Sequence, residues 1–400
     1  MKIVAVDAFP IRLDRDPAKT IGTAGSPTKL AATEFDYRWS ETYPALYSIH
    51  FETALVRIET EEGLTGWGEA QAPLAPEVAC TIVRTLLRPV LIGQKFKASR
   101  EDIERLWMTM YSTMRVRGQT GGFMLDAISG VDLALWDLAG KSRGESVARL
   151  LRGDDVRQKL PAYLSGLRGE RNKDRVISAE GYWEQGFRVF KLFHDRTTEE
   201  LFDLIDRLRA KFGGYIRIAV DALWRLGDED MIEFGKALDD RAALWLECPL
   251  LPEHVGTHER LAKSIKTPLA IGESYRTHFE IEPFLKRKVI GWLQPDLGRS
   301  GITESLRWAE RARNSAVSLV PHVSIALGPQ IAAALQLAAA TPECPLVEYN
   351  PRVLEVANHF LQEPLSLDGA AYQLPERPGL GIRLLESDVL ISEEAQTSSG

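Results

Sequence analysis

Hydrophobic positions along the chain change their spacing near residue 160. Beyond it, short apolar runs alternate with amphipathic stretches that carry apolar residues at helical spacing. The apolar runs occupy residues 162–165, 189–193, 216–220, 244–246, 269–271, 292–293, 318–320 and 345–347. Such alternation is typical of parallel βαβ units, and eight units close most simply into a (β/α)8 barrel of the TIM type.

The first part of the chain has a different pattern. Residues 4–13 alternate as a strand does, and apolar runs flank the turn Glu61-Glu62-Gly63, which predicts an antiparallel hairpin. Residues 15–47 form a long irregular stretch, and loops of that length are typically functional or disordered. Helical spacing follows at 76–92 and 100–114, and residues 123–141 are apolar on most sides, as in a buried helix.

These patterns predict an α/β protein in which a (β/α)8 barrel carries an α+β capping domain built from both ends of the chain. We expect the N-terminal capping domain to cover residues 1–125 and the barrel to cover residues 126–350. A Pro- and Gly-rich segment, 351–392, is expected to return to the cap, and the polar residues 393–400 are expected to form a flexible tail.

Composition and charge narrow the classes of partner. The 400 residues are 44% hydrophobic and 26% charged, as in ordinary globular proteins. A net charge of −7 argues against nucleic acid and anionic membrane surfaces as partners, and no apolar stretch is long enough to span a membrane. The three cysteines are far apart, which predicts buried side chains rather than disulfides or a zinc site. The N-terminus does not look like a signal peptide, so we expect a cytoplasmic protein.

Ionisable residues directly follow six of the predicted barrel strands. They are Asp221, Glu247, Glu273, Asp296, His322 and Glu348, separated by 26, 26, 23, 26 and 26 residues. The C-terminal ends of barrel strands meet at one mouth, where the active sites of such barrels lie. The spacing therefore predicts that these six side chains, distant in sequence, line one pocket.

Three of the six residues predict a metal site. Carboxylates without cysteine or clustered histidine suit a hard divalent cation, so Asp221, Glu247 and Glu273 are the expected ligands of Mg²⁺, with Mn²⁺ as a substitute. Helix caps and solvated loop acids are the alternative explanation for acids at these junctions.

Asp296 and His322 lie one βα unit apart, on neighbouring strands. An aspartate beside a histidine fixes its tautomer and stabilises the imidazolium, which predicts a general base; a purely structural pair is the alternative. Lys191 ends the second strand, and Glu348 follows the last one. By themselves, both are as compatible with the solvated rim of the barrel as with catalysis.

These residues, together with several short motifs, resemble a known family. The chain is similar to the mandelate racemase subgroup of the enolase superfamily over nearly its whole length. The motifs are Gly66-Trp67-Gly68-Glu69, Leu135-Trp136-Asp137-Leu138-Ala139-Gly140-Lys141, Glu247-Cys248-Pro249-Leu250, Gly272-Glu273-Ser274, Gln294-Pro295-Asp296, Pro321-His322-Val323-Ser324 and Pro378-Gly379-Leu380-Gly381. The resemblance implies a Mg²⁺-dependent enzyme that abstracts the proton α to a carboxylate and forms an enediolate.

The resemblance also implies residue roles. The three acids would bind Mg²⁺, His322 would be the base supported by Asp296, and Glu348 would hydrogen-bond the substrate carboxylate. The subgroup often has Lys-x-Lys at the second strand, whereas this chain has Lys191-Leu192-Phe193. Because phenylalanine cannot transfer a proton, a two-base racemase is disfavoured. We expect a one-base syn dehydration of an acid sugar to a 2-keto-3-deoxy acid, with Lys191 neutralising the carboxylate or enediolate.

Other outcomes remain open at this stage. A cycloisomerase or racemase of the same superfamily is the main alternative, a Schiff-base aldolase using Lys191 is another, and a non-catalytic binding protein is disfavoured by the complete set of acids and base. Loop 15–47 and residues 70–76 are expected to cover the mouth. Expected substrate contacts are Tyr47, Trp224, Arg225, Arg276 and Ser324, although rim packing would also explain them. His194 is expected to point off the barrel axis. The resemblance further implies a homo-oligomer.

Overall fold

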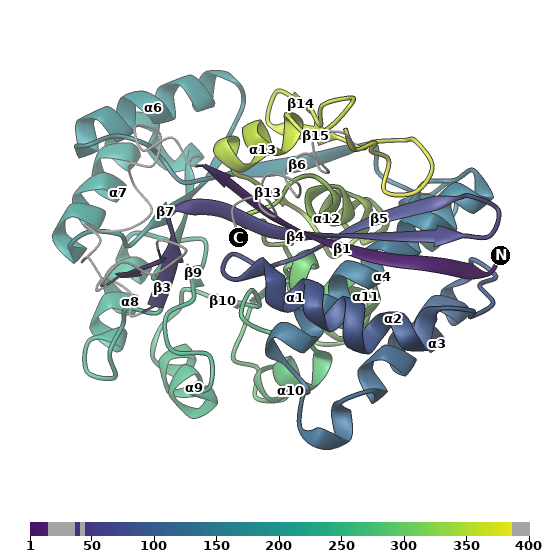
Figure 1. The fold of residues 1–400 in the computed structure, drawn as a ribbon. Coiled ribbons are helices and arrows are strands. Elements are labelled where there is room, and N and C mark those ends of the chain that lie inside the picture. The colour runs from purple at the N-terminus through teal and green to yellow at the C-terminus, as the bar shows by residue number, and fades with distance from the viewer. Residues whose placement is uncertain (15–36, 41–44, 386–400) are drawn as a thin grey trace.

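The computed structural model describes residues 1–14, 37–40 and 45–385, and it has the two-part α/β architecture that the sequence predicts (Figure 1). Most of the predicted covering loop 15–47 and the predicted tail 393–400 lie outside the described residues. All three cysteines are buried, as expected. Within the described residues, no helix combines the length and the apolar character needed to cross a membrane.

The N-terminal sheet is antiparallel, in the order β1 (Ile3–Asp14), β4 (His50–Thr60) and β5 (Thr65–Ala70). The predicted hairpin is β4–β5, in which Gly63 has the positive φ of 76° that the tight turn requires. A separate two-stranded sheet pairs β2 (Tyr37–Ser40) with β3 (Ala45–Ser48). The helical elements that follow are α1 (Pro76–Ile82), η2 (Val83–Leu87), α2 (Arg88–Leu91), α3 (Arg100–Ser112) and η3 (Arg115–Arg117).

The buried helix expected at 123–141 is α4 (Gly122–Arg143), which packs against β5. Two glycines of the Gly-Trp-Gly motif permit this contact. A Cβ atom on Gly66 would lie 2.3 Å from Ala134 O, and one on Gly68 would lie 2.0 Å from Gly130 O. The motif therefore serves close packing between strand and helix, and this packing fixes the position of Glu69 at the end of the strand.

The barrel strands are parallel and follow each other in sequence order around the ring. They are β6 (Lys159–Ser165), β7 (Val189–Phe193), β8 (Arg217–Asp221), β9 (Leu246–Glu247), β10 (Leu269–Ile271), β11 (Trp292–Leu293), β12 (Ser318–Leu319) and β13 (Val347–Tyr349). β13 pairs with β6, and Leu319 N donates to Glu343 O between β12 and the segment before β13, which closes the ring. The remaining helical elements are α5 (Val147–Arg152), α6 (Asn172–Glu184), α7 (Thr198–Phe212), η4 (Gly213–Tyr215), α8 (Met231–Asp240), α9 (Val255–Ser264), α10 (His278–Lys286), α11 (Leu297–Asn314), α12 (Pro329–Ala340) and α13 (Pro351–Asn358).

A compact layer of side chains fills the barrel below its mouth. It consists of Tyr163, Val189, Ala219, Trp245, Ala270 and Val320, with Trp292 and Leu346 packed against it. Because side chains alternate along a strand, the next inward position lies two residues further on. These positions are Ser165, Lys191, Asp221, Glu247, Gly272, Gln294, His322 and Glu348. The apolar layer thus forms the floor of a ring of mostly polar residues.

The C-terminal segment, which the sequence predicts to return to the cap, first contacts the barrel. Its hairpin, β14 (Leu367–Asp368) and β15 (Ala371–Gln373), adds to the barrel sheet, because β15 pairs antiparallel with β6 (Figure 1). Only the next stretch reaches α4, where Leu380 N donates to Asp137 Oδ1 at 2.8 Å. The short strands of this hairpin are too weakly patterned to be read from the sequence.

Candidate active site at the barrel mouth

The six residues expected at the strand ends come together in the structure. Asp221, Glu247 and Glu348 lie on strands β8, β9 and β13, while Asp296 is the N-cap residue of α11. Glu273 and His322 lie just beyond β10 and β12, and each keeps 12% of its side chain exposed. The other four are almost fully buried. Solvated rim positions are therefore excluded for these acids.

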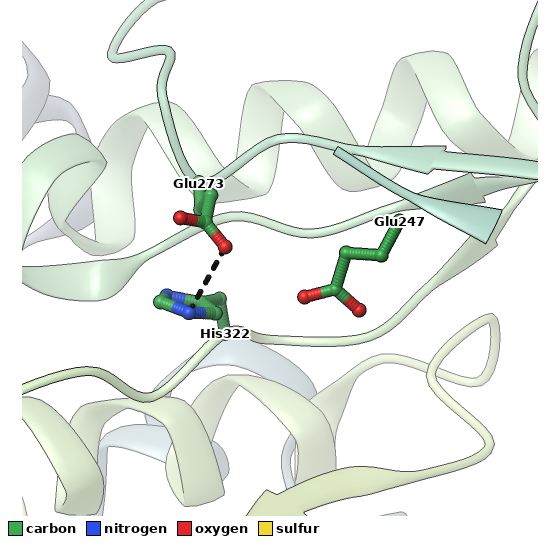
Figure 2. Close-up of side chains that lie close together, drawn as sticks. All are labelled: Glu247, Glu273 and His322. Carbon is green, nitrogen blue, oxygen red and sulfur yellow. Dashed lines mark ion pairs between the residues drawn. The ribbon is translucent and has the colours of Figure 1, made fainter. Parts of the chain in front are cut away.

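A tight cluster of possible metal ligands lies at the centre of the mouth. Glu247, Glu273 and His322 point toward one another (Figure 2), and one donor atom from each lies within 4.8 Å of the others. Asp221 is the neighbour of Glu247 in the β8–β9 register. Its Oδ1 accepts from Leu223 N at 3.0 Å. Within the described residues, this trio therefore contains His322 where the sequence predicts Asp221.

The electrostatics of the carboxylates favour a cation at this place. Burial, followed by the charge of Glu247, raises the pKa of Asp221 well above its usual value. Burial also raises the pKa of Glu273, although the nearby His322 opposes the shift. Buried carboxylates this close together are costly unless positive charge compensates them. The oxygen-rich donor set fits a hard divalent ion such as Mg²⁺.

Lys191 supplies one such positive charge. Its Nζ lies 2.6 Å from Glu247 Oε1, 2.9 Å from Glu348 Oε1 and 3.8 Å from Asp221 Oδ2. The side chain is only 1% exposed, which rules out a rim lysine in water. Burial by itself would lower the pKa of Lys191, but the charges of Glu247 and Glu348 outweigh it and hold the pKa well above its usual value. Lys191 is therefore a charged ammonium group.

His322 lies between two carboxylates. Its Nδ1 is 2.9 Å from Asp296 Oδ2 and its Nε2 is 3.1 Å from Glu273 Oε2. Burial disfavours the imidazolium, but Glu273, Glu348 and Asp296 outweigh that effect and raise the pKa of His322 to about 10. The expected Asp296–His322 pair is thus formed, and it leaves Nε2 facing the carboxylate cluster.

Glu348 is held in its ionised form. Its Oε1 contacts Lys191, and its Oε2 accepts from Val323 N at 2.9 Å. Burial would raise the pKa of Glu348, but Lys191 and His322 outweigh it and lower the pKa to about 2. The carboxylate is therefore bound to the protein itself before any substrate arrives.

The expected substrate-contacting residues have diverse surroundings. Arg276 forms a bidentate pair with Asp126 at 2.9 and 3.1 Å, and Arg225 donates to the carbonyls of His194 and Arg196. Both guanidinium groups thus already have protein partners. The remaining expected contacts are Trp224 and Ser324, which are half-buried beyond β8 and β12, and Tyr47, which lies on β3.

His194 lies outside the barrel, as expected from the alternation of strand residues. Its ring packs against Phe234 of α8, and its Nε2 is 3.2 Å from Thr198 Oγ1. Burial lowers the pKa of His194 to about 4, so this imidazole is neutral near pH 7. Phe193, the preceding residue, has its ring centroid 5.5 Å from Lys191 Nζ.

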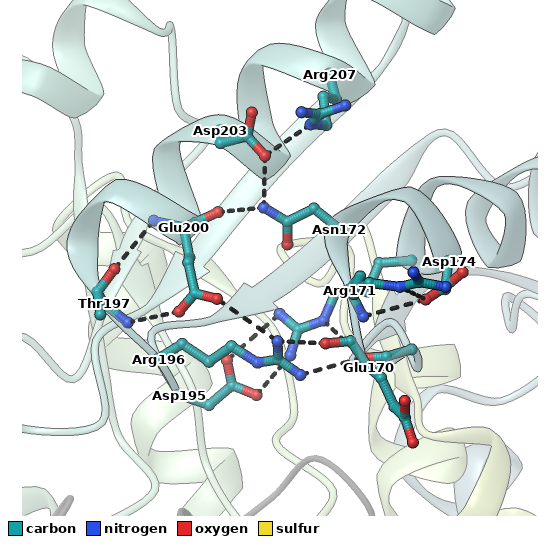
Figure 3. A network of polar contacts seen from close by, with 12 residues as sticks. Glu170, Arg171, Asn172, Asp174, Asp195, Arg196, Thr197, Glu200, Asp203 and Arg207 are labelled. Atoms are coloured by element: carbon teal, nitrogen blue, oxygen red, sulfur yellow. Dashed lines mark hydrogen bonds and ion pairs between the residues drawn. The ribbon is translucent and has the colours of Figure 1, made fainter.

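The loops after β6 and β7 are tied to each other beside the mouth (Figure 3). Arg175 pairs with Asp195 at 2.9 Å, and Arg196 donates to Glu170 O at 2.5 Å. Asn172 Nδ2 also donates to Glu200 O at 2.7 Å. These contacts join the first turns of α6 and α7, so this side of the mouth is held by a polar network.

Several residues of the site are absent from the sequence prediction. Trp245 Nε1 donates to Glu247 Oε2 at 2.9 Å, and Gln330 Nε2 donates to Asp296 Oδ1 at 2.9 Å. Ser165 and Gln294 complete the inward ring; within the described residues, the side-chain amide of Gln294 has no hydrogen-bond partner. Inward alternation from Trp292 would have placed Gln294 in the ring. Nothing in the sequence indicates the contact made by Gln330.

Comparisons with known proteins agree with this architecture. Residues 37–152 match the family "mandelate racemase / muconate lactonizing enzyme, N-terminal domain", and residues 174–388 match "enolase C-terminal domain-like". The D-galactarolactone cycloisomerase of Agrobacterium fabrum is 32% identical, over 82% of this chain and 88% of that protein. The D-galactonate dehydratase of Ralstonia pickettii is 32% identical, over 84% of this chain and 89% of that protein.

Comparison of the fold with solved structures also identifies the enolase superfamily. The crystal structure of an enolase superfamily member from Agrobacterium tumefaciens superposes with a TM-score of 0.87 at 29% identity, covering 96% of this chain and 97% of that one. The similarity thus extends along most of the sequence as well as over the fold. The chain therefore belongs to the mandelate racemase and muconate lactonizing enzyme family of the enolase superfamily, and it is an enzyme.

Proposed function

We propose that this enzyme dehydrates an acid sugar to a 2-keto-3-deoxy acid by removing the proton α to the carboxylate. The observation that carries the proposal is the asymmetry of the mouth. His322 presents Nε2 on one side, whereas the β7 position where a second base would stand is Phe193. One base supports a reaction that removes and returns a proton on one face of the substrate.

The proposed roles follow from the contacts. Asp221, Glu247 and Glu273 would hold Mg²⁺, with Mn²⁺ as a substitute. When bound, the ion would supply the positive charge that makes the α-proton acidic enough for an imidazole to remove. Lys191 would neutralise the substrate carboxylate from the other side. An ionised Glu348 would repel that carboxylate, so we propose that Glu348 acts by holding Lys191 in place.

The chemical step uses one nitrogen twice. The reacting form of His322 is the neutral imidazole, and a cation held by Glu247 and Glu273 would offset the carboxylate charge that raises the pKa of His322. Nε2 then takes the α-proton as the α C–H bond breaks, while Asp296 stabilises the imidazolium through Nδ1. The same nitrogen then gives the proton to the β-hydroxyl as the β C–O bond breaks, and water leaves. The remaining enol tautomerises to the 2-keto acid, so atoms and electrons balance without an oxidant.

A cycloisomerase is the second candidate. The cycloisomerase relative is as similar to this chain as the D-galactonate dehydratase is, and isomerisation of a sugar-acid lactone also needs only one base. The substrate and the mass of the product separate the two reactions. Dehydration of an acid sugar gives a 2-keto product that has lost one water, whereas ring opening of a lactone through the same kind of enol gives a 2-keto product of unchanged composition. Racemisation would instead return the carboxylate skeleton, with deuterium at the α-carbon in D₂O.

The surroundings of Lys191 argue against an aldolase. A Schiff-base lysine needs a neutral amine, usually obtained through a lowered pKa, whereas the carboxylates around Lys191 keep it charged. Borohydride should therefore fail to trap substrate on the enzyme. A covalent adduct on Lys191 would revive the aldolase hypothesis.

Replacement of the base tests the proposed mechanism. His322→Asn should lower kcat at least about a thousandfold while Mg²⁺ affinity, measured by isothermal titration, stays within about threefold of wild type. Asp221→Asn serves as the matched variant, and it should weaken Mg²⁺ binding instead. Loss of Mg²⁺ binding in His322→Asn would show that His322 is a ligand, as its place beside Glu247 and Glu273 would allow. Near-normal turnover would remove it from the mechanism.

A further inference from the structure

A buried glutamine, Gln330, connects the capping domain to the catalytic pair. Gln330 lies in the first turn of α12 and is fully buried. Its Nε2 donates to Asp296 Oδ1 at 2.9 Å, while the other oxygen of the same carboxylate, Oδ2, is 2.9 Å from His322 Nδ1. Gly298 N also donates to Oδ1, at 3.0 Å. Two donors thus hold Oδ1 and leave Oδ2 to the histidine.

Gln330 is itself held by a residue of the cap. Glu69, at the end of β5, accepts from Leu327 N at 2.7 Å and from Gln330 N at 3.2 Å. Thr53 Oγ1 of β4 donates to Glu69 Oε1 at 2.9 Å. The N-cap residue of α12 is a glycine without a capping side chain, so Glu69 caps this helix from the other domain.

We infer that Gln330, held by Glu69 of the cap, is a positioning residue that orients Asp296 and thereby sets the Nδ1–H tautomer and the ring orientation of His322. Every link is a hydrogen bond of 3.2 Å or less, and all the linked groups except His322 are almost fully buried. The physical reason is geometric, because a carboxylate with one oxygen fixed by two donors cannot rotate away from the imidazole. The inference extends the proposed function, since its catalytic consequence concerns the base of that reaction.

The alternative is that Gln330 only stabilises the fold, and the same helix offers a control. Gln336 is also fully buried on α12, where it accepts from Ala148 N and donates to the carbonyls of Pro375 and Leu380. Gln330→Met and Gln336→Met each remove buried hydrogen bonds with little change of volume. Only the first change touches the catalytic pair.

The experiment compares kcat, KM and the deuterium isotope effect on an α-deuterated substrate. Gln330→Met should lower kcat about tenfold and increase the isotope effect on kcat, with KM within about threefold of wild type. Gln336→Met should lower the melting temperature but leave kcat and the isotope effect unchanged. A reduced fraction of folded enzyme cannot change an isotope effect. An unchanged isotope effect in Gln330→Met would overturn the inference.

A measurement on the substrate-free enzyme keeps the inference separate from the proposed function. The Nδ1 proton of His322 should give a downfield NMR signal, assigned by its loss in His322→Asn. That signal should shift or broaden in Gln330→Met and stay in place in Gln336→Met. If the wild-type enzyme converts no acid sugar, the proposed function fails while this comparison still decides the inference. An unmoved signal in Gln330→Met contradicts it.

A comparison of single and double variants tests whether the cap acts on His322 through Gln330. Glu69→Gln should also lower kcat, and the double variant Glu69→Gln/Gln330→Met should be no slower than Gln330→Met by more than about twofold, because both changes disturb one pathway. If the two losses of kcat multiply in the double variant, Glu69 acts independently of Gln330. That result would overturn the part of the inference that gives the cap a role through Glu69.

Discussion

The buried carboxyl group of Glu69 couples stability to pH. Burial raises its pKa from 4.5 to about 7, although the N–H groups of Leu327 and Gln330 oppose the shift. Between these two values the folded state retains a proton that the unfolded chain releases. The free energy of unfolding therefore falls as the pH rises through this window. By pH 7 and above, it is about 3 kcal/mol lower than at pH values below both pKa values.

Glu69→Gln should remove this pH dependence, because an amide does not titrate. We expect the free energy of unfolding of the variant, relative to wild type, to increase by about 3 kcal/mol between about pH 4.5 and pH 7.5. Urea titrations at a series of pH values measure the difference. Parallel pH profiles for the two proteins would mean that Glu69 is ionised throughout the range.

Individual side chains also show where prediction from the sequence stops. Regular spacing behind apolar runs was enough to predict that Asp221, Glu247 and His322 meet, because barrel geometry brings strand ends together. The partner of Arg276 is Asp126, 150 positions away and in a helix that precedes the barrel, and no periodicity links the two. Long-range ion pairs of this kind depend on how the cap sits on the barrel.

At the level of strands, the close approach of the segments that follow β10 and β11 depends on a glycine. Gly272 has φ of 155°, and a Cβ atom there would lie 2.3 Å from Gln294 O. This glycine lets the chain leave β10 close to β11 and places Glu273 at the mouth. In the motif Gly272-Glu273-Ser274, the glycine thus allows the close backbone approach, while Glu273 supplies the carboxylate.

Gly272→Ala should therefore destabilise the protein by at least about 2 kcal/mol and disturb the mouth. Gly181→Ala is the matched control, because a Cβ atom on Gly181, in α6, would meet no atom within 4 Å apart from its chain neighbours and the backbone of its own helix. We expect the free energy of unfolding of this variant to increase by about 0.5–1 kcal/mol, because alanine has a higher helix propensity than glycine. Chemical denaturation measures the stability of both variants. Equal stability of the two variants would contradict the packing argument.

The sequence predicts strand positions well where a run of apolar residues is continuous. The runs at 189–193 and 269–271 coincide with β7 and β10, because buried parallel strands read as continuous apolar stretches. The two-residue strand β14 and the three-residue strand β15 lack such a signal. Their pairing with β6 is decided by tertiary contacts rather than by local preference.

Across the whole molecule, Asp137 joins segments from three parts of the chain. Its Oδ2 accepts from Trp67 N at 2.8 Å and pairs with Lys141 at 2.6 Å, while its Oδ1 accepts from Leu380 N at 2.8 Å. The residue thus links the cap hairpin and the C-terminal segment to α4. The sequence predicted a cap built from both ends of the chain but gave no indication of the residue that joins them.

Asp137→Ala should lower the free energy of unfolding by about 3–5 kcal/mol, because it leaves buried N–H groups without an acceptor. Asp154→Ala is the control, since the Asp154 side chain is 93% exposed and its pair with Arg149 should contribute less than about 1 kcal/mol. Urea denaturation reports both changes. A loss below about 1 kcal/mol in Asp137→Ala would show that the segments are held together by other contacts.

The most direct test of the proposed function is a panel of mono- and diacid sugars incubated with the enzyme and Mg²⁺ in D₂O, with products identified by NMR. We expect at least one acid sugar to give a 2-keto-3-deoxy acid, with no product in EDTA and none from His322→Asn. Return of the carboxylate skeleton with deuterium at the α-carbon and without any 2-keto acid would contradict dehydration and assign the enzyme to isomerisation.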